Sequence, residues 1–277
     1  MVAALLIAFR EGLEAALIVG ITLGYLRRVR LVRQSRYIWM GVMAAVLASV
    51  LLAAGFQLVG LELEGRSEQL FEAGTMFLAV GVLTWMIFWM RYRARLMGSA
   101  LERDVQQAIS KGQNWGLVAV AFVAVFREGV ETALFLSAAA FAGQAAGTLI
   151  GAILGLALAA SIGLLIYTSS VRLNVKLFFQ VTGALLLLFA AGMLAHGVHE
   201  LQETGLVPTL IEQLWDTNSI LDERSPLGEA LKALVGYNGN PSVEEVIAYG
   251  AYWLLALVGV RWWVERKTAQ AEPILRD

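Results

Sequence analysis

Two stretches of the sequence carry the same pair of carboxylates directly behind an arginine. Residues 9–17 read Phe-Arg-Glu-Gly-Leu-Glu-Ala-Ala-Leu and residues 126–134 read Phe-Arg-Glu-Gly-Val-Glu-Thr-Ala-Leu, which is identity at seven of nine positions. Glutamates three residues apart on a helix share one face. Because apolar residues flank both stretches, the sequence predicts two helices of an internal repeat, each presenting two carboxylates from an apolar surrounding.

This pattern of residues is suited to binding a hard cation. Carboxylate oxygens are ligands for magnesium, calcium, manganese and iron rather than for Cu(I). Arg10 and Arg127 can each pair with an acid of their own motif, and the site then keeps a net charge of about −2, which suits a divalent ion. A trivalent ion would need another carboxylate. The alternative is a buried Arg–Glu network that only fixes helix pairing. The predicted metal ligands are the four motif glutamates, Glu11, Glu14, Glu128 and Glu131.

The composition places these motifs in a membrane protein. The 277 residues are 58% hydrophobic and only 16% charged, and the mean hydropathy is +0.68, whereas soluble domains carry about 25% charged residues. The net charge of −1 gives no reason to expect a nucleic-acid partner. The absence of cysteine excludes iron–sulfur clusters and thiolate zinc sites. Charges interrupt the first apolar segment, so we expect a retained helix rather than a signal peptide.

The chain is predicted to be a single all-α transmembrane domain, residues 1–277. A spanning helix needs roughly 20 mostly apolar residues. Residues 1–91 and 115–200 are predicted to form two three-helix units, followed by an extracytoplasmic loop, 201–242, and a seventh helix, 243–264. About seven stretches meet the length requirement: 2–26, 37–60, 70–90, 115–141, 147–167, 177–198 and 243–263.

The loop charges predict an orientation in the plasma membrane, the inner membrane of a bacterium. Short loops rich in Lys and Arg stay cytoplasmic, so the N-terminus is expected outside and the C-terminus inside. The two motif helices then run in opposite directions with both motifs near the bilayer midplane, as in inverted-repeat transporters. The basic residues follow the first, third, fifth and last segments: Arg27, Arg28, Arg30, Arg33, Arg36, Arg91, Arg93, Arg95, Arg103, Lys111, Arg172, Lys176, Arg266 and Lys267.

A second group of candidate ligands lies at the expected outer end of the sixth segment. His196, His199, Glu200 and Glu203 recur at helical spacing and share one helix face. His196 and His199 are the two histidines of the chain. Together with Glu72, near the outer end of the third segment, they could form a site where a metal first binds. The alternative is a polar helix end at the membrane interface.

Several other features are expected to be structural. Trp89 is interpreted as an interface anchor and Met86 as core packing, while Ser242 and Glu245 have the spacing of a capping box. The loop before Ser242 is long enough to hold one or two short helices over the outer mouth. A stripe of small residues predicts close helix packing: Gly143, Gly147, Gly151 and Gly155.

The duplicated motif resembles the oxidase-dependent iron permease family of fungi and bacteria, and the Efe-type bacterial iron uptake permeases in particular. Three other stretches are similar to that branch: residues 83–90 (Leu-Thr-Trp-Met-Ile-Phe-Trp-Met), residues 190–192 with Glu203 and Gly205, and residues 236–237 with 241–242. The resemblance covers nearly the whole chain. It implies iron import, with the four motif glutamates as ligands and an extracytoplasmic iron-binding or oxidase partner.

The expected function is therefore that of an iron permease, with iron as the transported substrate and no permanently bound cofactor. Three alternatives stay open at this point. The cargo could be another divalent cation such as manganese or lead, the chain could be a membrane metalloenzyme using the helix-six histidines, or it could be a structural membrane subunit. The histidine spacing does not match the metalloprotease motif. Oligomeric assembly is compatible with any of these functions.

Overall fold

The computed structural model describes residues 1–93, 103, 105–107, 109, 114–142, 145–168, 175–223 and 225–271. Over these residues the chain forms helices and no strand, which confirms the all-α class. The basic residues Arg95, Lys111 and Arg172 lie outside the described residues, as does Gly143. The helices are α1 (Val2–Arg28), α2 (Ser35–Glu62), α3 (Arg66–Arg93), α5 (Asn114–Phe141), α6 (Ala145–Thr168), α7 (Val175–Glu203), the short α8 (Pro226–Val235) and α9 (Val243–Ala271), with a 3₁₀ turn η1 (Val32–Gln34).

Four of these helices, α2, α3, α6 and α7, are long and apolar enough to cross a membrane. In a bilayer the backbone must satisfy its own hydrogen bonds, so long uninterrupted helices are the expected form. α1 and α5 have similar lengths, but the motif charges stand in the middle of each. Large apolar side chains such as Met43, Leu47 and Leu51 of α2 are exposed, as suits contact with lipid. The count of seven spans and the orientation of the termini stay predictions.

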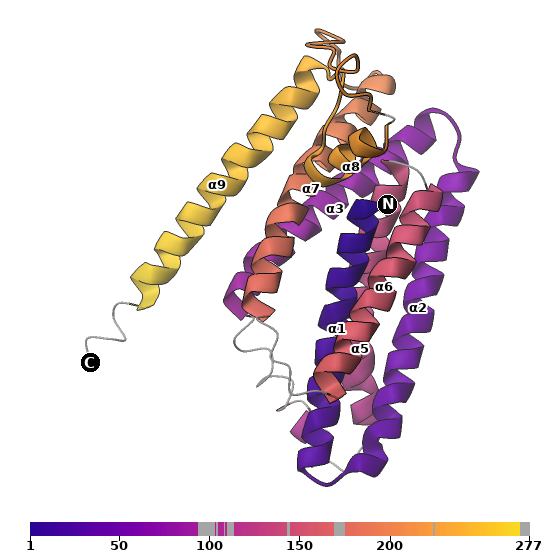
Figure 1. Ribbon diagram of the computed structural model, residues 1–277, viewed down its shortest axis with the longest axis vertical. Helices are drawn as coiled ribbons and strands as arrows, with labels where there is room; N and C mark the ends of the chain where they lie inside the picture. Colours follow the sequence, from indigo (N-terminus) through magenta and orange to yellow (C-terminus); the bar gives the residue numbers. More distant parts are fainter. Residues whose placement is uncertain are drawn as a thin grey trace.

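The helices are arranged in an interleaved way (Figure 1). α1 packs mainly against α6, and α2 packs mainly against α5, while α1 also contacts α5. α3 and α7 pack together beside this group, and α9 lies on the far side of α7 (Figure 1). The main packing partner of α1 and that of α5 thus each come from the other half of the chain.

Small residues permit this close packing. A side chain at Gly151 of α6 would collide with the Met1 carbonyl oxygen of α1's cap. A side chain at Gly41 of α2 would likewise collide with the Val118 carbonyl oxygen of α5. Gly155 of α6 meets the backbone of α1 one turn further along. Gly151 and Gly155 of the predicted small-residue stripe therefore pack α6 against α1, and α2 has an equivalent contact that the sequence pattern did not single out.

The long loop between α7 and α9 folds over one end of the molecule, beside the start of α1 (Figure 1). It contains one short helix among its described residues, α8, as the loop length predicted. Ser225 caps this helix by accepting a hydrogen bond from the Gly228 N–H, and Gly236 ends it in the left-handed conformation at φ +70°. The predicted capping box at α9 is confirmed by the 3.2 Å hydrogen bond from the Glu245 N–H to Ser242 Oγ.

Candidate functional site

The two motifs meet in the middle of the helix bundle. Helix α1 carries Arg10, Glu11 and Glu14, and helix α5 carries the equivalent residues of the second motif. The start of α1 and the end of α5 line one cavity, through Ala4 and Ala139 respectively, so the two helices run in opposite directions. Because α1 and α5 are in contact, their motifs lie side by side.

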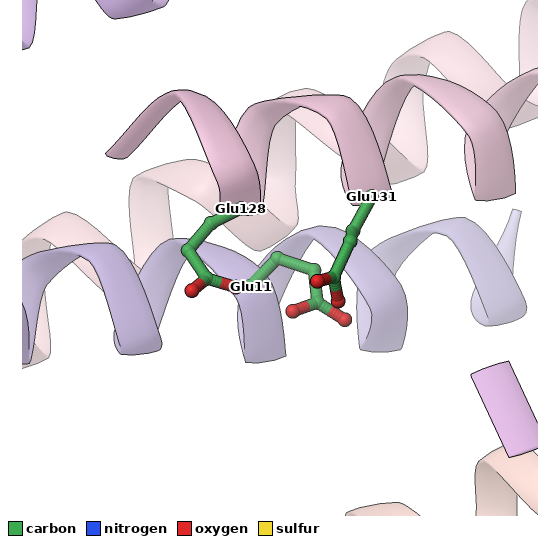
Figure 2. Close-up of side chains that lie close together, drawn as sticks. All are labelled: Glu11, Glu128 and Glu131. Atoms are coloured by element: carbon green, nitrogen blue, oxygen red, sulfur yellow. The ribbon is translucent and has the colours of Figure 1, made fainter. Parts of the chain in front are cut away.

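Three of the four motif glutamates converge on one point. Carboxylate oxygens of Glu11, Glu128 and Glu131 lie within 4.8 Å of one another. Figure 2 shows the Glu11 side chain extending from α1 toward the two glutamates of α5. Glu11 and Glu128 are 1% and 2% exposed and the Glu131 side chain is 12% exposed, so this carboxylate triad is largely shielded from solvent. An arrangement of three carboxylates at this separation can surround a single hard cation.

Glu14 has a different position from the other three. Its carboxylate lies 3.2 Å from the Arg10 guanidinium, at the i, i+4 spacing, and it does not join the triad. Arg10 also lies 3.4 Å from Glu11. Both oxygens of Glu11 and of Glu14 are buried and accept no hydrogen bond from any described residue. Buried carboxylates need a partner of opposite charge, and Arg10 supplies only one positive charge for these two acids.

The two motif arginines occupy different environments although their local sequences match. The Arg10 side chain is 2% exposed, whereas the Arg127 side chain is 38% exposed. Arg127 donates from Nε to Glu131 at 3.0 Å and lies 4.0 Å from Glu128. Each arginine therefore pairs with the glutamate four residues ahead, as the spacing predicts.

The glycine inside each motif allows a neighbouring helix to approach the carboxylates. A Cβ atom on Gly12 would lie 2.9 Å from the Ala159 Cβ of α6. A Cβ atom on Gly129 would overlap the Ser49 side chain of α2. The sequence predicted room for close approach at both positions, and the helices that use it are α6 and α2.

The predicted outer residues on α7 form pairs. His196 lies 3.6 Å from Glu200, and His199 lies 3.4 Å from Glu203, with the two imidazole rings stacked at 5.9 Å between centroids. Gln69 of α3 donates to Glu203 at 2.6 Å, which places Glu72, one turn further along α3, on the side of this cluster. Within the described residues these side chains do not form a second compact group of metal ligands like the triad.

A cavity of about 660 Å³ lies at the same end of the molecule and was not anticipated from the sequence. The starts of α1 and α6, the end of α5, the side of α7 and the long loop enclose it. Glu245, which the sequence presented only as a capping residue, lines the cavity and lies 3.0 Å from His199. The acidity of the loop was the one signal in the sequence for this cavity. Its charged and histidine lining consists of His196, Asp222, Glu223, Glu229, Lys232 and Glu245.

Comparison with known proteins agrees with the resemblance of the motifs. The model of the iron permease FTR1 family matches residues 1–268. The ferrous iron permease EfeU of Yersinia pestis is 37% identical over 255 residues, covering 91% of this chain and 90% of the relative. EfeU of Escherichia coli O157:H7 is also 37% identical, covering 91% of this chain and 92% of the relative. No solved structure matches the chain. These are transporters rather than enzymes, and this chain belongs to the iron permease FTR1 family.

Proposed function

We propose that this chain imports ferrous iron across the bacterial inner membrane through the carboxylate triad between α1 and α5. The observation that carries the proposal is the convergence of Glu11, Glu128 and Glu131, which lie within 4.8 Å of one another at a buried point. Relatives with 37% identity are named ferrous iron permeases, which supports iron as the cargo.

The charge of the site favours a divalent ion. The four motif glutamates carry four negative charges, and the two arginines offset two of them. One divalent cation balances the remaining charge of about −2, so the loaded site buries little net charge. The uncompensated cost of mid-membrane charges, about 2.5–3.5 kcal/mol for each on insertion scales, makes a cation a stabilising component of the loaded site.

The architecture that we propose is an inverted repeat of two three-helix units, α1–α3 and α5–α7, with α9 as the seventh span. Its support is the exchange of partners, since α1 packs on α6 as α5 packs on α2. Equivalent residues make equivalent contacts, because Gly151 meets Met1 as Gly41 meets Val118. Inverted repeats with a midplane site between them are a common transporter plan.

The path that we propose begins at the cavity under the long loop, on the outer side of the membrane. His196 and Glu245 line this cavity, and Glu72, His199, Glu200 and Glu203 lie on the neighbouring face, so both groups attract cations to the outer end. Ala4 of α1 lines the inner wall of the cavity. Glu11 follows two turns later, about 10 Å further along the helix axis. An extracytoplasmic partner that delivers iron would meet the face formed by residues 201–242.

Uptake of radioactive Fe²⁺ into proteoliposomes tests the proposal. Glu131→Gln keeps the shape of the side chain and removes one ligand charge, so we expect uptake to fall at least about tenfold, the lower range for perturbed metal sites. Glu62→Gln, at the exposed end of α2, is the matched control and should transport as wild type. Equal uptake by wild type and Glu131→Gln would rule out the triad as the transport site. If the wild-type protein takes up Mn²⁺ or Pb²⁺ faster than Fe²⁺, that ion and not Fe²⁺ would be the divalent cargo.

A further inference from the structure

Helix α3 contacts both motif arginines through two residues for which the sequence predicted other roles, Met86 in core packing and Trp89 as an interface anchor. Arg10 approaches the sulfur of Met86, with 3.5 Å between Nη2 and Sδ. The guanidinium carbon of Arg127 lies 4.7 Å from the centroid of the Trp89 ring. Met86 and Trp89 are three residues apart and therefore share one face of α3. One helix thus holds the two arginines about one turn apart.

The two contacts have different consequences for the carboxylates. Arg10 turns both terminal nitrogens toward acids, Nη1 to Glu11 at 3.4 Å and Nη2 to Glu14 at 3.2 Å. Arg127 approaches its acids through Nε, at 3.0 Å from Glu131 and 4.0 Å from Glu128. An aromatic face attracts a guanidinium stacked on it. The Trp89 ring thereby opposes the two-pronged pairing with carboxylates that a guanidinium otherwise prefers.

We propose that Trp89 is a positioning residue that restrains Arg127 over its ring and so leaves Glu128 and the second oxygen of Glu131 available to the transported cation. The proposal rests on the proposed function of the triad. Trp89 is partly buried against the core cluster that contains Met86 and Leu83, so the ring has a fixed place from which to hold the arginine. Without the ring, Arg127 gains freedom to pair with both acids and compete with the cation.

Substitutions at Trp89 test the proposal through the concentration dependence of Fe²⁺ uptake. Trp89→Leu is expected to raise KM roughly five- to thirtyfold, the factor given by a cation–π contact of ordinary strength, while Vmax falls much less. Trp89→Phe keeps an aromatic face and should recover most of the affinity. Trp85→Leu, on the exposed side of the same helix, is the control and should match wild type.

A double variant separates positioning from mere support of the fold. If Trp89 acts through Arg127, adding Trp89→Leu to Arg127→Gln changes KM no further. An unchanged KM in Trp89→Leu, or an equal rise in both backgrounds, would overturn the proposal. Equilibrium binding of Mn²⁺ to the detergent-solubilised protein gives a readout that does not need transport, and the same factor is expected there. Wild-type protein that binds Mn²⁺ but takes up no iron would refute the proposed function, while the Trp89 comparison would still decide this inference.

Discussion

The contact between Gly129 and Ser49 predicts that one added methyl group lowers the stability of the protein and that a second substitution restores it. Gly129 stands between two glutamates of the triad on α5, and a Cβ atom there would lie 2.6 Å from the Ser49 Cβ of α2. Rotating the serine hydroxyl cannot relieve that approach, so the helices must separate. Overpacking of this kind costs up to about 3 kcal/mol, and alanine returns about 1 kcal/mol in helix propensity. Gly129→Ala should therefore lose about 2 kcal/mol of stability.

The assay is thermal unfolding in detergent with Fe²⁺ absent. For a chain of this size, about 2 kcal/mol corresponds to a melting temperature lower by roughly 4–8 °C. Adding Ser49→Gly removes both clashing atoms and leaves the Ser49 Cα position 3.9 Å away, so the double variant should recover most of the loss. Gly55→Ala is the control on α2, because a Cβ atom there meets nothing within 4 Å.

Two results would refute this reasoning about the helix contact. One is a Gly129→Ala protein that melts at the wild-type temperature. The other is a double variant no more stable than Gly129→Ala alone, since the destabilisation would then arise elsewhere than at Ser49. A loss in Gly55→Ala equal to that in Gly129→Ala would also show that the effect is not specific to the α2–α5 contact.

Two further predictions concern the cap helix and the cation. Ser225→Ala removes the side-chain acceptor for the Gly228 N–H and should destabilise α8 by about 1 kcal/mol. Amide hydrogen exchange should become faster in residues 226–235 and stay unchanged in α7. Unchanged exchange in α8 would contradict the prediction. A divalent cation that binds the folded triad stabilises the protein by about 2.7 kcal/mol at a hundredfold excess over its Kd. The melting temperature of the wild type should therefore rise with Fe²⁺ concentration, and the rise should be much smaller in Glu128→Gln. Equal rises in both proteins would place the cation elsewhere.

The sequence determined the chemistry of the site because the relevant distances are short along the chain. An i, i+3 pair of glutamates must share a helix face, and an arginine must reach an acid four residues ahead, as Arg10 and Glu14 do. The apolar composition determined the helical class, since a chain in lipid has to satisfy its backbone internally. The duplication of the motif pointed to two helices meeting at one place.

The tertiary structure alone decided which side chains meet across helices. The sequence predicted four converging glutamates, and the structure brings Glu11, Glu128 and Glu131 together and leaves Glu14 beside Arg10. Nothing in the local sequence distinguishes Arg10 from Arg127, yet their side chains are 2% and 38% exposed. Helix α3 places Met86 against the first arginine and Trp89 against the second. Only the packing of α3 brings Trp89 and Met86 to the site. They lie 38 and 76 positions along the chain from Arg127 and Arg10 respectively, so no local spacing pattern could predict these contacts.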